Sequence, residues 1–224
     1  WFDLERVSEL ARRFGSLLPI PIEVCANGRT ERVNEEPPPW RRSFGSVEEA
    51  RAASLEFGKK HLNTDLFDMI PLQSDAGAVQ GLAFVLPYSP SPTSPPAHRV
   101  YLKDMLLAER AENLLPRWAF FVTCVLNTND LRPTASRESF YEDANLQAAR
   151  DALGASIRDY LVRLRTEDPR RLEILISLHF RAIKALAAHP PDFLAPLLAL
   201  LPFAPSIGPL TFLVRRTTFS TRTW

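Results

Sequence analysis

Two long stripes of apolar residues between positions 146 and 186 place the strongest limit on how this chain can fold. In each stripe an apolar residue recurs every three or four positions, first over 146–164 and then over 172–186. Residues at this spacing lie on one face of an α-helix, and that face must be buried. Asp168 and Pro169 separate the stripes and are typical of a helix start. The sequence therefore predicts two consecutive amphipathic helices here.

The preceding part of the chain mixes strand and helix patterns. Capping residues or a proline predict helices over about 4–14, 46–60 and 116–126. Apolar runs predict strands over 20–25, 30–33, 67–72, 79–86 and 98–102, and Asn27-Gly28 joins the first two as a hairpin. The proline-rich stretch 88–96 is interpreted as an exposed loop, and 193–201 as a short apolar helix. Strands mixed with helices, followed by helices alone, predict an α/β layer with a helical extension.

Composition and charge exclude several function classes. The 224 residues are 46% hydrophobic and 24% charged, with a formal net charge of +1, which is ordinary for a soluble globular protein. Paired arginines are scattered, so there is no basic cluster that would indicate nucleic-acid binding. The longest apolar stretch, 193–203, is interrupted by prolines and is too short to span a bilayer. There is no signal peptide. The missing initiator methionine suggests a fragment of a longer protein.

The sequence contains no complete active site. It lacks a glycine-rich phosphate loop and the common hydrolase and zinc motifs, and its four histidines are dispersed. His179 lies on the apolar face of its helix and is expected in the core. Cys25 and Cys124 are expected to be buried structural thiols, with no metal spacing and no disulfide, which fits a reducing cytoplasmic compartment.

The segment 131–138, Leu-Arg-Pro-Thr-Ala-Ser-Arg-Glu, is the most informative for function. It places Arg137 in a loop between two packed elements. An arginine guanidinium keeps its charge and offers a rigid fork of donors that suits phosphate or carboxylate. Two interpretations are open from the residue alone: Arg137 senses a phosphate, or it is a surface or loop-bracing arginine.

Four segments resemble the middle domain of the heat shock protein 90 chaperone family, bacterial HtpG type. They are Arg-Val-Tyr-Leu-Lys at 99–103, Glu-Asn-Leu-Leu-Pro-Arg-Trp-Ala-Phe-Phe-Val at 112–122, Asn-Thr-Asn-Asp-Leu at 127–131, and Ser-Arg-Glu at 136–138. Weaker similarity extends to 1–24 and 201–206, so the resemblance covers most of the chain. It implies a mixed sheet flanked by helices and followed by a helical extension, a fold like ribosomal protein S5 domain 2. The corresponding domains are a large α/β subdomain over 1–142, a helical connector over 143–203, and a divergent or truncated tail over 204–224.

The resemblance also implies a role for the Ser-Arg-Glu loop in ATP hydrolysis. In this family the nucleotide pocket and the general-base glutamate belong to a separate N-terminal domain, and the middle domain contributes one arginine to the terminal phosphate. Arg137 matches that arginine and is the predicted catalytic residue, with Ser136 and Glu138 beside it in the ATP-contact loop. Tyr141 stands where the family has a glutamine. No cofactor or metal is expected in this fragment, whereas the full-length protein would bind ATP and Mg.

Client binding is the second role that the resemblance implies. The loop at 63–69 suggests Leu66 and Phe67 as client-binding residues, and Trp40 is a further candidate for an exposed aromatic side chain. The alternative is that Phe67 and Met69 belong to the next strand. Expected partners are client proteins and the N-terminal ATPase and C-terminal dimerisation domains, with no nucleic acid and no membrane; the fragment itself is expected to be a monomer.

Two further classes remain open at this point. One is an independent α/β enzyme whose site carries no recognised motif. The other is a structural scaffold domain. On the leading interpretation, the chain is a stress-response chaperone fragment that completes an ATPase without being an enzyme on its own.

Overall fold

A mixed five-stranded sheet organises the protein. The computed structural model describes residues 3–26, 28–34, 36–91 and 98–187. The helices are α1 (Leu4–Gly15), α2 (Val47–Leu62), α3 (Ala144–Glu167) and α4 (Pro169–Ala187), with single turns at Pro39–Arg41, Ala76–Ala78 and Arg117–Ala119. The strands are β1 (Glu23–Ala26), β2 (Arg29–Arg32), β3 (Asp68–Ser74), β4 (Val79–Val85), β5 (His98–Leu102), β6 (Met105–Ala111) and β7 (Val122–Thr128).

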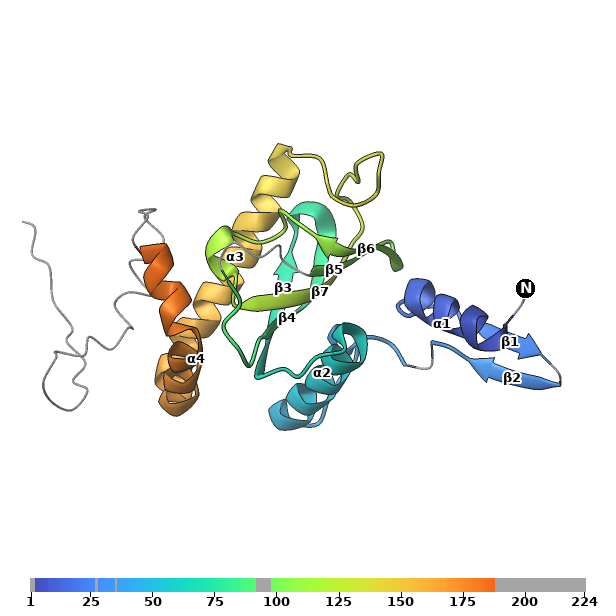
Figure 1. Cartoon of the computed structure of the whole chain (residues 1–224), viewed down its shortest axis with the longest axis horizontal. Coiled ribbons are helices and arrows are strands. Elements are labelled where there is room, and N and C mark those ends of the chain that lie inside the picture. The colour runs from blue at the N-terminus through green and yellow to red at the C-terminus, as the bar shows by residue number, and fades with distance from the viewer. Residues whose placement is uncertain (1–2, 27, 35, 92–97, 188–224) are drawn as a thin grey trace, which may run out of the picture.

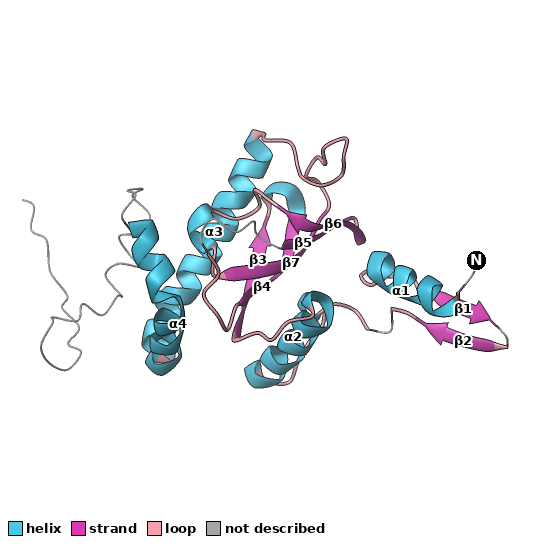
Figure 2. Cartoon of the chain, in the orientation of Figure 1, coloured by secondary structure: helices cyan, strands magenta, loops and turns pink. Residues whose placement is uncertain are grey.

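The five strands β3 to β7 are ordered β3-β4-β7-β5-β6. Strands β5 and β7 run parallel, and the other neighbours are antiparallel. Helix α2 packs on one face, together with Leu17 and Trp40. Helices α3 and α4 cover the other face, where the larger core lies (Figures 1 and 2). The α/β class and the mixed sheet flanked by helices are therefore confirmed.

The centre of the sheet corrects one prediction. A helix was expected from Pro116 to about residue 126, but only Arg117–Ala119 forms a helical turn, and the chain then enters β7. All seven residues of β7 are buried. Val122, Cys124 and Leu126 contribute to the α3 side of the core, whereas Val125 contributes to the α2 side. A strand buried on both faces is apolar throughout, so its sequence does not alternate and resembles a buried helix.

The predicted helices α3 and α4 are confirmed, and they share the core of the sheet. The stripe residues Leu146, Leu153, Ile157 and Leu161 are at most 2% exposed. They belong to the same apolar cluster as β3, β4 and β7, so the core continues across the boundary expected near residue 142. The helix expected at 193–201 and the tail at 204–224 lie outside the described residues.

Helix α1 and the β1–β2 hairpin lie at one end of the molecule, beside the sheet (Figure 1). Both were predicted, although β1 is shorter than the expected 20–25 and β2 is shifted by one residue from the expected 30–33. Asp3 caps α1 by accepting from the Glu5 amide, and Ala26 pairs with Arg29 across the turn. The Arg13 guanidinium donates to both carboxylate oxygens of Glu109 in β6. That ion pair fastens α1 to the edge of the sheet.

The two cysteines differ in environment, which corrects the expectation for one of them. Cys25 in the hairpin is exposed, whereas Cys124 in β7 is buried, and burial raises the pKa of the Cys124 thiol. The thiolate is the reactive form, so Cys124 should be inert in the folded protein. We expect a thiol reagent to modify one cysteine under native conditions and two in denaturant. Mass spectrometry of the labelled chain would show this, and native labelling of Cys124 would contradict the fold.

Two histidines are buried, so the free energy of unfolding is expected to depend on pH. His98 and His179 are at most 4% exposed, and burial lowers the pKa of each imidazole to about 4. The unfolded chain binds a proton near pH 6.5, but the folded chain binds it only below about pH 4. The free energy of unfolding should therefore fall as the pH drops from 7 to 5, on the order of 1–2 kcal/mol per histidine. Urea titrations at both pH values test this, and His98→Gln should flatten the dependence.

No helix in the described part of the chain is long and apolar enough to cross a membrane.

Candidate functional site

The segment between β7 and α3 forms a closed loop with Arg137 near its tip. Its two arms pair through a bridge between Pro133 and Phe140. The Thr134 amide donates to the Ser139 carbonyl at 2.9 Å, and the Tyr141 amide donates to the Arg132 carbonyl at 3.0 Å. These bonds bring the arms together below the tip.

Arg137 occupies the left-handed backbone region, with φ of 57°. Its amide donates to the Thr134 carbonyl at 3.0 Å, which closes the turn. A residue with a Cβ seldom adopts this region, and such conformations cluster where the surrounding structure enforces them, often at functional sites. The left-handed turn at Arg137 is thus imposed by the loop.

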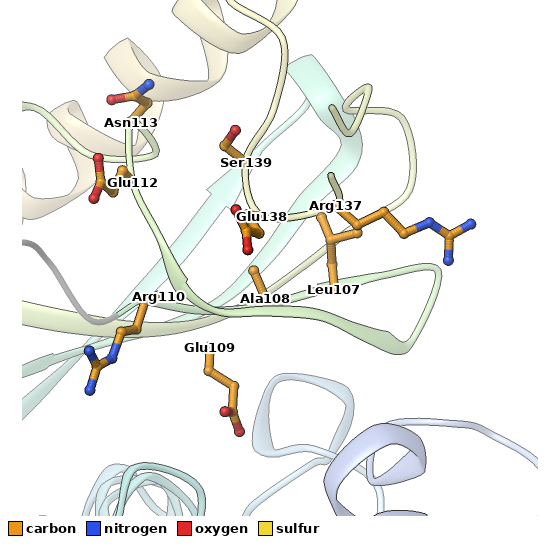
Figure 3. Close-up of a pocket in the computed structure, with 9 residues that line it drawn as sticks. All are labelled: Leu107, Ala108, Glu109, Arg110, Glu112, Asn113, Arg137, Glu138 and Ser139. Atoms are coloured by element: carbon orange, nitrogen blue, oxygen red, sulfur yellow. The ribbon is translucent and has the colours of Figure 1, made fainter. Parts of the chain in front are cut away.

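The Arg137 side chain is exposed and makes no hydrogen bond or ion pair with any residue that the structure describes. In Figure 3 its guanidinium points away from the neighbouring labelled side chains. A bracing arginine would bond to the loop or to a nearby acid. This arrangement does not fit a brace among the described residues, but it fits a surface arginine as well as a phosphate-sensing one.

The loop borders a hollow of about 520 Å³. Strand β6 and the turn after it form one wall, and the loop forms the other (Figure 3). The lining residues are Leu107, Ala108, Glu109, Arg110, Glu112, Asn113, Arg137, Glu138 and Ser139. Glu138 and Ser139 thus line the wall, whereas Ser136 has its hydroxyl on Thr134. Of the predicted ATP-contact residues, Arg137 and Glu138 therefore line the hollow, and Ser136 bonds within the loop.

The base of the loop is anchored in the core. Leu131 and Phe140 are each 3% exposed and belong to the main apolar cluster. Arg150 on α3 donates to the Asn113 carbonyl at 2.7 Å and to both carboxylate oxygens of Glu142 at 2.8 and 3.0 Å. Arg150 thereby ties the end of the loop to the turn that follows β6.

Tyr141, at the position of the family glutamine, is 49% exposed. The Arg132 guanidinium lies over its ring at 5.5 Å from the centroid. An arginine over an aromatic face is a weakly favourable arrangement at exposed sites. Tyr141 therefore lies on the paired arms, below the tip that carries Arg137.

The predicted client-binding residues are half-buried. Trp40, expected to be exposed, packs edge-on against Phe57 at 5.4 Å, and it contacts the α2 side of the core. The reason for this correction is that the turn Pro39–Arg41 directs the indole onto α2 and β4. Leu66 contacts the same cluster. Phe67 packs against the main core, and its amide donates to the Val85 carbonyl at 2.8 Å, which extends the β3–β4 ladder.

A buried carboxylate follows directly after Phe67. Asp68 is 1% exposed and accepts from the Arg51 guanidinium of α2 at 2.9 Å. Tyr160 of α3 donates its hydroxyl to the same carboxylate, and Arg171 of α4 approaches to 3.7 Å. Burial and the neighbouring carboxylate raise the pKa of Tyr160. Asp68 therefore links the three helices that cover the two faces of the sheet.

Among the described residues, no group of three or more His, Cys, Asp or Glu side chains is arranged to hold a metal ion. His179 is fully buried, as predicted, and its Nε2 donates to the Leu86 carbonyl at 3.0 Å.

Sequence reasoning missed three features of this site. Strand β6 was not predicted, because its polar residues Glu109 and Arg110 interrupt the apolar pattern. Thr134 and Arg150 were not singled out. The partners of Thr134 lie only two and five residues away, but the closing of the loop tip on its hydroxyl appears only in the fold. Arg150 bonds to the Asn113 carbonyl 37 residues away, which a local pattern does not indicate.

The curated proteins that are similar to this chain are HtpG chaperones. No protein-family model matches the chain. It is 23% identical to the chaperone protein HtpG of Rhodococcus jostii over 198 residues, which cover 80% of this chain and 31% of that protein. It is 25% identical to HtpG of Nitratidesulfovibrio vulgaris over 80% of the chain, and 26% identical to HtpG of Methylorubrum extorquens over 68%.

The matches span 25% to 31% of the length of these relatives. They cover 68% to 80% of the present chain. The resemblance stated from the sequence is thus confirmed: the chain is similar to a segment of HtpG, of the heat shock protein 90 chaperone type.

Proposed function

We propose that this chain is the middle-domain segment of an ATP-dependent HtpG-type chaperone. It brings Arg137 to the terminal phosphate of ATP held by an N-terminal domain, and it binds unfolded client polypeptide. One observation supports the first part: at the tip of a hydrogen-bonded loop, the exposed Arg137 guanidinium has no bonding partner among the described residues and points away from the other labelled side chains of the hollow (Figure 3). The similarity to HtpG supports the same assignment.

The chemistry follows from the properties of arginine. Phosphoryl transfer develops charge on the oxygens around the transferring phosphorus, and a fixed cation placed there lowers the barrier. Among the described residues the Arg137 guanidinium has no ion pair to break before it reaches a phosphate. Its rigid fork can bond two phosphate oxygens at once.

The segment alone should bind no nucleotide productively. We expect the isolated chain to hydrolyse no ATP, and the same chain joined to its nucleotide-binding domain to hydrolyse it. A coupled assay for released phosphate measures both. If the isolated chain hydrolyses ATP and the activity copurifies with it, this proposal is wrong and the chain is an independent enzyme.

Client binding near Leu66 and Phe67 is the second part of the proposal. Because both side chains are half-buried, we expect weak contact at their exposed edges. A fluorophore on Asp65→Cys, in a Cys25→Ser background, should respond to unfolded, reduced α-lactalbumin. The same fluorophore on Arg165→Cys, on the helical layer across the sheet, is the control. Equal responses at both positions would remove the client assignment from this loop.

A further inference from the structure

We infer that Thr134 is the positioning residue that presents Arg137 to the phosphate. The inference rests on the proposed function and adds a residue to it. Thr134 lies three positions before Arg137, at the point where the two arms of the loop meet. It bonds both sides of the tip through its backbone and through its hydroxyl.

The Thr134 hydroxyl uses its full hydrogen-bonding capacity within the loop. A hydroxyl has one proton to donate and two lone pairs to accept with. Thr134 Oγ1 donates to the Ser139 carbonyl at 3.2 Å. It lies 3.1 Å from the Ser136 hydroxyl and 3.3 Å from the Ser139 hydroxyl, so it can accept from both. One oxygen atom thus joins the residues on either side of Arg137.

These bonds hold a backbone conformation that arginine does not favour on its own. The left-handed region at Arg137 is unfavourable for a residue with a Cβ, because the Cβ lies too close to the following carbonyl oxygen. The Arg137 amide also donates a hydrogen bond to the Thr134 carbonyl, so Thr134 holds the backbone that leads into Arg137. Without the Thr134 hydroxyl, the tip should sample other conformations, and the guanidinium would be in place for a smaller fraction of the time.

The rest of the loop should survive loss of the hydroxyl. Leu131 and Phe140 hold both ends of the loop in the core, and Arg150 holds Glu142. Thr134→Val keeps the shape of the side chain and removes only the hydroxyl. Its effect should therefore be confined to the tip, with the midpoint of global unfolding close to that of the wild type.

The first test measures the loop without any nucleotide. Trypsin cleaves after an exposed arginine once the local chain can open. We expect Thr134→Val to speed cleavage after Arg137 by about 10-fold, equivalent to about 1.4 kcal/mol, and Thr134→Ser to stay near the wild-type rate. Thr166→Val removes a hydroxyl that donates to the Arg163 carbonyl in α3 and is the matched control. Unchanged cleavage in Thr134→Val, or equal acceleration in Thr134→Ser or Thr166→Val, would overturn the inference.

The second test is kinetic and uses the chain joined to its nucleotide-binding domain. Thr134→Val should lower kcat about 10-fold with little change in KM, and Thr134→Ser should restore it. In an Arg137→Ala background the Thr134→Val substitution should have no further effect, because it acts through Arg137. Additive losses in the double variant would overturn the inference.

The two tests separate this inference from the function on which it rests. If Arg137→Ala alone hydrolyses ATP at the wild-type rate, the proposed function fails, whatever trypsin shows. If Arg137→Ala is slow while Thr134→Val leaves both cleavage and kcat unchanged, the function stands and the positioning role fails.

Discussion

Replacing Arg137 with alanine, in the protein that joins this chain to its nucleotide-binding domain, is expected to lower the rate of ATP hydrolysis on the order of 10³-fold. The guanidinium is exposed and unpaired among the described residues, so its removal takes away no contact that holds the fold. Nucleotide binding should change little, because the proposed pocket belongs to another domain. Steady-state hydrolysis and a separate measurement of ATP affinity check the two expectations.

Three further variants make this result specific. Arg137→Lys should recover only part of the rate, because an ammonium does not reproduce the planar fork. Arg110→Ala removes another arginine from the same hollow and should leave the rate unchanged. Arg137→Gly relieves the left-handed backbone, so it should be as inactive as Arg137→Ala without loss of stability. If Arg137→Ala hydrolyses ATP at the wild-type rate, Arg137 takes no part in the hydrolysis.

The largest effect on stability is expected from Asp68→Ala. This change leaves the guanidinium of Arg51 and the hydroxyl of Tyr160 without their shared acceptor, and Arg171 without its nearby carboxylate. Removing one partner of a buried ion pair costs about 3–5 kcal/mol. Arg51 and Arg171 are each 34% exposed and can recover some hydration, so the lower end of that range is expected. Urea denaturation followed by circular dichroism measures the change.

Asp65→Ala is the matched control for Asp68. The Asp65 carboxylate pairs with Lys59 but is 79% exposed. Solvent screens exposed ion pairs and they contribute little to stability, so the urea midpoint should shift little. If the two alanine variants unfold at the same urea concentration, Asp68 is not the link between the helices and the sheet. That outcome would contradict the role of Asp68 but not the fold described above.

Local patterns were sufficient to predict most of the helices and several strands. Asp3 and Ser46 begin α1 and α2, as their capping positions indicated. The stripe over 146–164 became the buried face of α3, and residues 98–102 formed β5 as predicted. Each of these signals depends on neighbours within a few residues, so the sequence carries it directly. The Ser-Arg-Glu motif likewise identified the loop and its family resemblance without any coordinates.

Only the tertiary structure decided features that depend on distant partners. The part of the apolar run from residue 122 onward became a central strand because β4 and β5 pair with it on either side. Trp40 and Leu66 became half-buried because they pack with α2 against the sheet. Cys25 became exposed because its hairpin lies beside the sheet and not in the core. Likewise, the fold decides that the Arg137 guanidinium is exposed and has no bonding partner among the described residues. A sequence pattern records which side chains are apolar or charged, but burial and pairing are set by segments that meet only in the folded chain.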